Sequence, residues 1–285
     1  MFQRTQQKHD FDAHNFATRN SKTMKTFSLC AALLMTTLSA RAHDTWIETN
    51  TNVFRVGDAV GFSLMLGNHG NNHRDFKMSG KLDIADATLN LIAPNNQKTD
   101  LKPRLRDVGY APEEGFWTGR SVASQAGLYT LVHTLDAIAS YAPTRNVKSA
   151  KTFFIASRSL DRVPMNTTGF NRVLNLPFEI VPEINPVAPR GPGTPLTVRV
   201  YHKGKPLANT VVSFIPRGEN LTSTFDARYE RRTNINGRAT FEPKSANMYL
   251  VVAHHTTNES GQGYTSTKYS ATMTVFVPQV CPCCG

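Results

Sequence analysis

Histidine and cysteine side chains are the residues of this sequence whose types and spacing could do chemistry. Imidazole and thiolate groups are nitrogen and sulfur ligands that transition metals prefer in proteins. The candidate metal ligands are His43, His69, His73, His133, His254, His255, Cys281, Cys283 and Cys284. Because one ion needs several ligands, the strands and loops that carry these residues decide which of them can form a site.

A secretory signal peptide is predicted over residues 24–42. Lys25 supplies its positive start, an uncharged apolar run follows, and Ala40-Arg41-Ala42 has the A-x-A pattern of a cleavage site. An N-terminal membrane anchor or a buried helix is the alternative, but the apolar run is too short to span a bilayer. Residues 1–23 are polar and aperiodic, and we interpret them as a non-native or disordered extension. The mature chain is therefore expected to be soluble and periplasmic or secreted.

Cleavage after Ala42 would make His43 the first residue of the mature chain. Its α-amine, with an ordinary pKa of about 8, and its imidazole could then chelate one ion. Two further ligands would complete a tetragonal nitrogen and oxygen site, which suits Cu(II) or Ni(II). Asp44 could add a carboxylate to such a site. The alternative is that His43 only marks the cleavage point.

Two further pairs of histidines are close in sequence. His69 and His73 occupy a stretch rich in Gly and Asn that is expected to be a loop. There the two imidazoles could converge on one ion, or they could simply be solvated. His254 and His255 follow an apolar strand, and successive strand residues point to opposite faces of a sheet. Only one member of this pair is therefore expected to face a given site.

The remaining histidines have strong structural alternatives. His133 lies in the middle of a predicted strand, where a buried histidine with satisfied hydrogen bonds is the alternative to a ligand. His202 precedes a Lys-Gly turn and is expected to be exposed.

Three cysteines, Cys281, Cys283 and Cys284, lie in a tail formed by residues 279–285. Thiolates suit soft ions such as Cu(I) or Zn(II). Oxidation or an intermolecular disulfide is the alternative, because three cysteines cannot all pair within one chain.

Enzymatic and nucleic-acid-binding functions are not expected. The sequence contains no G-x-S-x-G motif, and the adjacent carboxylates Glu113 and Glu114 lie in a Pro- and Gly-containing stretch where they are expected to be solvated. The formal net charge is +11, but the basic residues are scattered. Nucleic-acid binding would require a concentrated basic patch or stripe. We therefore predict no catalytic residue and no nucleic-acid partner.

Short alternating strands separated by turn residues predict an all-β fold. We expect two β-sandwich domains, Ig-like or transthyretin-like, over residues 43–157 and 196–278. Residues 158–195 are predicted to be a Pro-rich linker, because five prolines between residues 181 and 195 remove backbone donors that a central strand needs.

Several motifs resemble those of DUF4198-type exported proteins. The similar segments are residues 42–48, 176–182, 185–186, 204–207, 233–241 and 270–275. The resemblance spans roughly residues 43–277, nearly all of the predicted mature chain. Asn234-Ile235-Asn236 departs from it, because the family usually has an acidic residue before the position of Gly237.

The resemblance implies a periplasmic component of a nickel or cobalt uptake system. Its ligand would be a divalent transition metal, Ni, Co or Cu, and its partner a membrane metal permease, with no catalysis. One alternative is copper handling, which the cysteine tail and a terminal His43 would support equally well. Another is a non-metal adhesion or carbohydrate-binding sandwich, which the second domain alone fits as well.

Overall fold

Segments rich in Val, Thr and Phe form strands along most of the chain, as their β-propensity predicts. The computed structural model describes residues 43–70, 73–111, 114–164, 166–187, 191–221 and 224–279, with only the backbone described for 68–70, 73–80 and 110. In this part of the chain the regular structure is eighteen strands and one short 3-10 helix, η1 (Lys102–Arg104). The prediction of an all-β fold is confirmed.

The first sheet is antiparallel and comes entirely from the N-terminal half. Its order is β1 (Asp44–Thr49), β3 (Ala59–Gly70), β8 (Glu114–Val122) and β7 (Arg106–Ala111), with β4 (His73–Gly80) also paired to β3. β1 and β3 pair from Asp44↔Gly67 to Thr49↔Phe62. This pairing places the residues that follow the predicted cleavage site at one end of β1.

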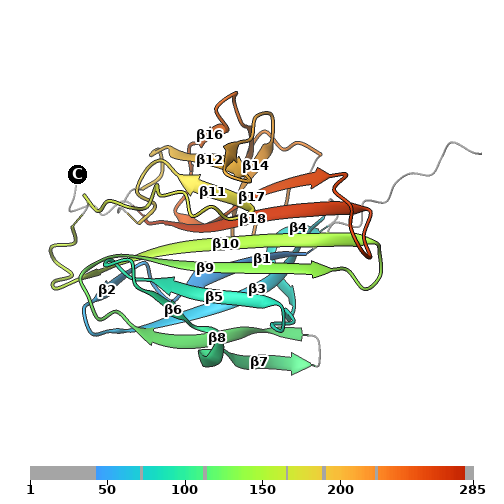
Figure 1. The fold of residues 1–285 in the computed structure, drawn as a ribbon. Helices are drawn as coiled ribbons and strands as arrows, with labels where there is room; N and C mark the ends of the chain where they lie inside the picture. The colour runs from blue at the N-terminus through green and yellow to red at the C-terminus, as the bar shows by residue number, and fades with distance from the viewer. Residues whose placement is uncertain are drawn as a thin grey trace, which may run out of the picture. The chain divides into compact units, whose positions relative to one another are not determined.

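The central sheet contains strands from both halves of the chain. Its order is β15 (Glu230–Arg232), β14 (Val211–Pro216), β17 (Asn247–Thr257), β18 (Ser266–Val277), β10 (Thr144–Ser157), β9 (Gly127–Ile138), β5 (Ala87–Ile92) and β6 (Lys98–Asp100), and β2 (Val53–Arg55) pairs with β10. β10 and β18 run parallel and side by side (Figure 1), from Thr144↔Ser266 to Lys151↔Met273. The segments predicted as two domains therefore share one sheet.

The third sheet is small and covers the C-terminal half of the central sheet. It consists of β11 (Phe178–Pro182), β12 (Leu196–His202), β13 (Lys205–Pro206) and β16 (Arg238–Phe241). β11 comes from the segment predicted as a linker, and all five of its residues are buried. It is an edge strand that ends at Pro182, a position where proline costs no ladder hydrogen bond.

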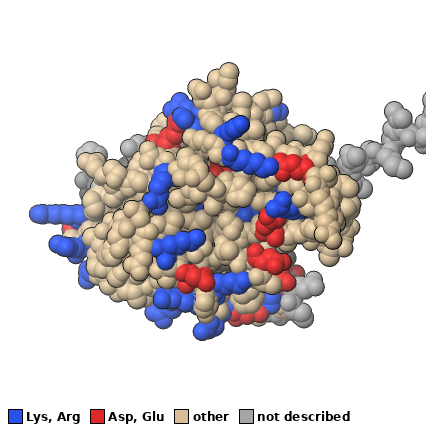
Figure 2. All heavy atoms as spheres, viewed as in Figure 1, with Lys and Arg blue, Asp and Glu red and all other residues tan. Residues whose placement is uncertain are grey.

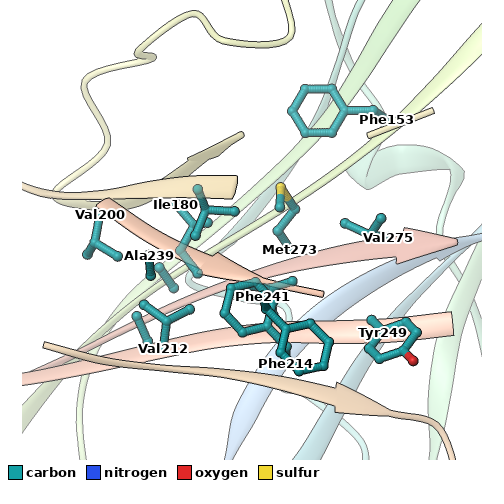
Figure 3. Packing of buried hydrophobic residues seen from close by; sticks show 14 of the residues in the cluster. Phe153, Ile180, Val200, Val212, Phe214, Ala239, Phe241, Tyr249, Met273 and Val275 are labelled. Carbon is teal, nitrogen blue, oxygen red and sulfur yellow. The ribbon is translucent and has the colours of Figure 1, made fainter. Parts of the chain in front are cut away.

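Two large hydrophobic cores lie on opposite faces of the central sheet. One is between the central and first sheets and the other between the central and third sheets, so the fold contains two sandwiches. One core includes Phe62 and Leu64 of β3 with Leu131 of β9. The other includes Phe214 and Phe241, whose stacked rings lie 4.9 Å apart (Figure 3). Along β10, Phe153 belongs to the second core and Phe154 to the first, so this strand is buried on both faces. The predicted two-sandwich architecture is thus present, built around a shared central sheet.

Charged residues on the face drawn in Figure 2 are of both signs and interspersed. Several charged residues of the described chain form ion pairs, in which Arg238 Nε lies 2.6 Å from Glu183 and Lys203 Nζ lies 2.6 Å from Glu259. No helix among the described residues combines the length and apolar character that crossing a membrane requires.

Candidate functional site

The start of β1 is anchored by the tryptophan of the opening motif. Trp46 is buried against Leu250 and Val252 of β17, in a third small core. Thr272 Oγ1 of β18 donates a hydrogen bond to the Thr45 carbonyl at 2.7 Å, and Thr274 Oγ1 donates to the Ile47 carbonyl at 2.7 Å. β1 therefore lies on the C-terminal half of the central sheet as well as pairing within its own sheet.

Asp44 and His254 lie on the faces of β1 and β17 that pack against each other through Trp46 and Val252. Asp44 lies two residues before Trp46, on the same face of β1, and His254 lies two residues after Val252, on the same face of β17. The Asp44 carboxylate is fully buried, and His254 Nε2 lies 2.9 and 3.0 Å from its two oxygens. The contact joins residues 210 positions apart in the sequence.

Lys148 of β10 fixes the residue before Asp44. Its side chain is buried, and its Nζ donates a hydrogen bond to the His43 carbonyl oxygen. Burial lowers the pKa of Lys148 to about 8, while the nearby Asp44 carboxylate acts in the opposite direction. The buried ammonium and the buried carboxylate offset each other's charge, which reduces the cost of burying either one.

The surroundings of the His43 imidazole lower its pKa and so favour its neutral form. Burial lowers the pKa of His43 first, and the charge of Lys148 lowers it further. Asp44 and a hydrogen bond to the Gly67 backbone act in the opposite direction. A neutral imidazole is the form that can ligate a metal ion.

His133 of β9 is also within the electrostatic reach of Lys148. Its side chain is fully buried, and its Nδ1 lies 2.8 Å from the Thr88 carbonyl oxygen. Because a carbonyl only accepts, Nδ1 carries the proton and Nε2 presents its lone pair. Nε2 is buried with no hydrogen-bond partner in the described part of the chain. Metal-ligating histidines have this arrangement, with one ring nitrogen held by a carbonyl and the other available.

The pKa of His133 is lowered to about 4, chiefly by burial and further by Lys148, against the effect of the Thr88 hydrogen bond. His133 is thus neutral across the physiological range. The alternative to a ligand is a buried histidine whose hydrogen bonds are all satisfied. That holds for Nδ1 but not for Nε2.

The adjacent residues His254 and His255 point to opposite faces of β17, as strand geometry predicts. His254 faces Asp44, whereas the His255 ring lies 4.8 Å from the ring of His202 in the second sandwich. His202 is half-buried, so the expectation that it is exposed is wrong. Its position depends on the packing of β12 against β17, which its own sequence neighbours do not indicate.

The expected loop around His69 and His73 is instead the end of a hairpin. His69 belongs to β3 and His73 to β4, and the two strands pair through His69↔Arg74 and Gly70↔His73. The placement of the two imidazoles lies outside the described residues, as do the signal peptide and Cys281, Cys283 and Cys284.

The structure thus brings together His43, Asp44, Lys148 and His254, and couples His133 to them through the charge of Lys148. As they stand, no three His, Cys, Asp or Glu side chains in the described ranges are grouped so that they could hold a metal ion. Lys148 is the member of this group that was not identified from the sequence. Its one signal is that it is a charged residue within an otherwise strand-like segment.

Similar folds are found among solved structures, at low identity. The D0-D1 domain of intimin is 11% identical over 82% of this chain and 98% of that chain, with a TM-score of 0.22. A DUF4785 family protein from Legionella pneumophila subsp. pneumophila str. Philadelphia 1 is 11% identical over 73% of this chain and 50% of its own, with a TM-score of 0.26. Salmonella alpha-2-macroglobulin reacted with methylamine is 12% identical over 83% of this chain and 15% of its own, with a TM-score of 0.25.

Likenesses this weak leave the fold to be argued from the strands themselves. No curated protein matches the sequence. The family described as "Domain of unknown function (DUF4198)" matches residues 40–257, which include the opening motif, His254 and every strand of the shared sheet except β18. The chain therefore belongs to the DUF4198 family.

Proposed function

We propose that the protein is exported, binds a divalent transition-metal ion, nickel or cobalt, and delivers it to a membrane metal permease without catalysing a reaction. One observation carries the proposal. The carbonyl of His43, the residue that follows the predicted cleavage site, is held by Lys148, and the next residue, Asp44, contacts His254. A flexible segment would have to be ordered on binding, whereas the backbone of His43 is held in advance, which would lower that cost.

The donors gathered around β1 suit these ions. After cleavage His43 would offer its α-amine and imidazole, and Asp44 and His254 would add oxygen and nitrogen donors. Nitrogen and oxygen ligands of this kind suit Ni(II), Co(II) and Cu(II). The Nε2 lone pair of His133 is a further buried donor.

Lys148 and Asp44 act on the terminal residue in different ways. Lys148 holds the His43 carbonyl, which fixes the backbone from which the amine and the imidazole project. The Asp44 carboxylate supplies the negative charge that a site holding both a lysine and a dication requires. The family resemblance to uptake components, together with this positioning, favours binding and delivery over catalysis.

The test is calorimetric titration with Ni(II), Co(II) and Cu(II) of chains whose three tail cysteines are replaced by serine. One chain begins at His43, and a second carries one additional glycine before His43. The extension keeps every side chain but moves the amine away from the imidazole. We expect affinity to fall by about 10-fold or more in the extended chain. Equal affinity of the two chains would overturn the terminal chelate.

Two variants locate the other ligands. We expect His133→Gln to weaken binding if its Nε2 reaches the ion, whereas the pair His69→Ala and His73→Ala tests the hairpin. Binding that is unchanged in His133→Gln and lost in the hairpin variant would move the site to β3 and β4. Cu(II) is expected to bind such a site most tightly whatever the cargo, so the comparison that bears on the proposal is the affinity for Ni(II) against that for Co(II).

A further inference from the structure

A second group of histidines lies in the C-terminal sandwich, on the opposite face of the central sheet from Asp44. His202 is the last residue of β12, His255 lies on β17 and Tyr269 lies on β18. The His202 ring is 4.8 Å from the His255 ring and 4.6 Å from the Tyr269 ring. The two histidines come from different sheets and face each other across the sandwich.

Strand register holds this group in place. His255 and Tyr269 are direct partners across β17 and β18, and Phe178 and His202 are direct partners across β11 and β12. The Phe178 ring is 6.2 Å from each of the two histidine rings and closes the apolar side of the group. The backbone positions of both histidines are therefore set by regular sheet pairing.

The separation of the two rings matches that of two imidazoles on one metal ion. With metal–nitrogen bonds of about 2.0–2.1 Å, each ring centroid lies about 3.2 Å from the ion. Two such rings are about 4.5 Å apart in a square-planar cis arrangement and about 5.2 Å apart in a tetrahedral one. The observed 4.8 Å lies between these values. The direction of each ring nitrogen depends on χ2, a torsion with broad minima, so the backbone need not move.

A carboxylate is hydrogen-bonded to the tyrosine of this group. The Glu259 carboxylate accepts a hydrogen bond from Tyr269 Oη at 2.8 Å and from Lys203 Nζ at 2.6 Å. Its charge acts on the pKa values of both His202 and His255, which places it within electrostatic reach of both. Lys203 and Glu259 form an exposed ion pair. Such pairs contribute little free energy, so a metal ion could replace the Lys203 ammonium beside the Glu259 carboxylate at little cost.

The surroundings of both histidines favour binding of a metal ion by their ring nitrogens. His202 Nε2 is buried and has no hydrogen-bond partner among the residues that the structure describes. Burial lowers the pKa of His202 first, and His255 and Lys203 lower it further, against Glu259. Burial likewise lowers the pKa of His255. Both rings are thereby favoured in the neutral, ligating form.

We infer that His202 and His255 form a second site for a divalent ion such as Zn(II) or Cu(II). Their side chains and that of Glu259 do not stand as a ready-made site in the structure, so Glu259 would turn from Lys203 to the ion to complete it. Two imidazoles and one carboxylate leave a fourth position for water or a small ligand, which is the composition of an open zinc site. The site does not depend on cleavage of the signal peptide, because His202 and His255 face the opposite side of the central sheet from Asp44 and need no α-amine. It is therefore independent of the proposed terminal chelate.

The experiment uses the chain with one extra glycine before His43 and with serine in place of Cys281, Cys283 and Cys284, so that the terminal chelate and the thiols do not contribute. Binding of Zn(II) is followed by calorimetry in this chain and in its His202→Ala, His255→Ala and Thr256→Ala variants. Thr256→Ala is the matched control, because it truncates the exposed neighbour of His255 on β17 and removes no proposed ligand of either site.

We expect one equivalent of Zn(II) bound between His202 and His255 in the parent chain and in Thr256→Ala, and binding at least about 10-fold weaker in His202→Ala and His255→Ala. Glu259→Gln should weaken binding while keeping the contact with Tyr269. Histidine NMR signals of the unsubstituted parent give a second readout that needs no variant, and those of His202 and His255 should shift on addition of Zn(II). Absence of binding by the parent chain, equal binding by His255→Ala, or shifts confined to other histidines would overturn the site.

Discussion

Two buried lysines on one strand have different partners and different roles in the fold. Lys148 and Lys151 both lie on β10, on opposite faces, and both are buried. Lys151 lies 2.7 Å from the Glu179 carboxylate and so has a direct ionic partner. Lys148 instead donates to the His43 carbonyl and has Asp44 nearby. Lys151 thus connects two sheets, and Lys148 holds the backbone at the start of β1.

His133 should make the stability of the protein depend on pH. Its pKa is about 4 in the folded chain and about 6.5 when unfolded, so the unfolded chain binds more protons between these values. Stability is therefore fully present above pH 6.5 and declines as the pH falls towards 4, by about 3 kcal/mol. Urea unfolding at a series of pH values measures this decline.

The comparison is with His133→Gln, which lacks the titrating group. Its unfolding free energy should fall less over the same interval, because only the other histidines remain to titrate. Parallel curves for the two proteins would show that His133 is not the buried neutral group described above.

At the scale of elements, the buried pair of Lys151 and Glu179 ties β11 to the central sheet. The Glu179 carboxylate also accepts hydrogen bonds from the backbone N–H groups of Leu174 at 2.9 Å and Leu176 at 3.3 Å. One carboxylate thus organises the approach to β11 as well as the strand itself. This explains how a Pro-rich segment predicted as a linker can hold a buried strand.

Removing one member of this pair should be strongly destabilising. Glu179→Gln would leave the Lys151 ammonium buried without a counter-charge, and we expect the free energy of unfolding to fall by about 3–5 kcal/mol. The double variant Lys151→Met with Glu179→Gln should recover part of the loss. Denaturant titration of the three proteins measures both effects, and a double variant no more stable than Glu179→Gln would contradict the role of the unpaired charge.

At the scale of the whole described unit, the parallel pairing of β10 with β18 makes the two sandwiches share strands. β10 contributes Phe153 to one core and Phe154 to the other, so unfolding of this strand would disrupt both cores. We therefore expect a single cooperative unfolding transition in residues 43–279, with fluorescence and circular dichroism giving the same midpoint.

The same sharing predicts how the protein responds to a cut in its connecting segment. A protease site inserted between Thr168 and Gly169 lies among exposed residues between β10 and β11. After cleavage the two fragments should co-elute in gel filtration and separate only in denaturant. An uncut insertion variant is the control, and separation of the fragments under native conditions would show two domains joined only by the linker.

Much of the fold follows from local patterns. The alternation in segments such as Leu196–His202 predicts strands, and it places His254 and His255 on opposite faces whatever they pack against. The sandwich architecture follows as well, because many short strands with one apolar face need a second layer to cover it. The opening motif marks residues 43–48 through family resemblance, but it does not show what Asp44 contacts.

The sequence by itself determined the strand content, the family and the list of histidines and cysteines that could act as ligands. Only the tertiary structure decided that Asp44 meets His254, that Lys148 holds His43, and that His202 faces His255. Side-chain alternation is a property of one strand and can be read locally. Which strands become neighbours depends on strand order and on packing between sheets, as in the pairing of β10 with β18 more than 100 residues later, and these are decided by burial over the whole chain.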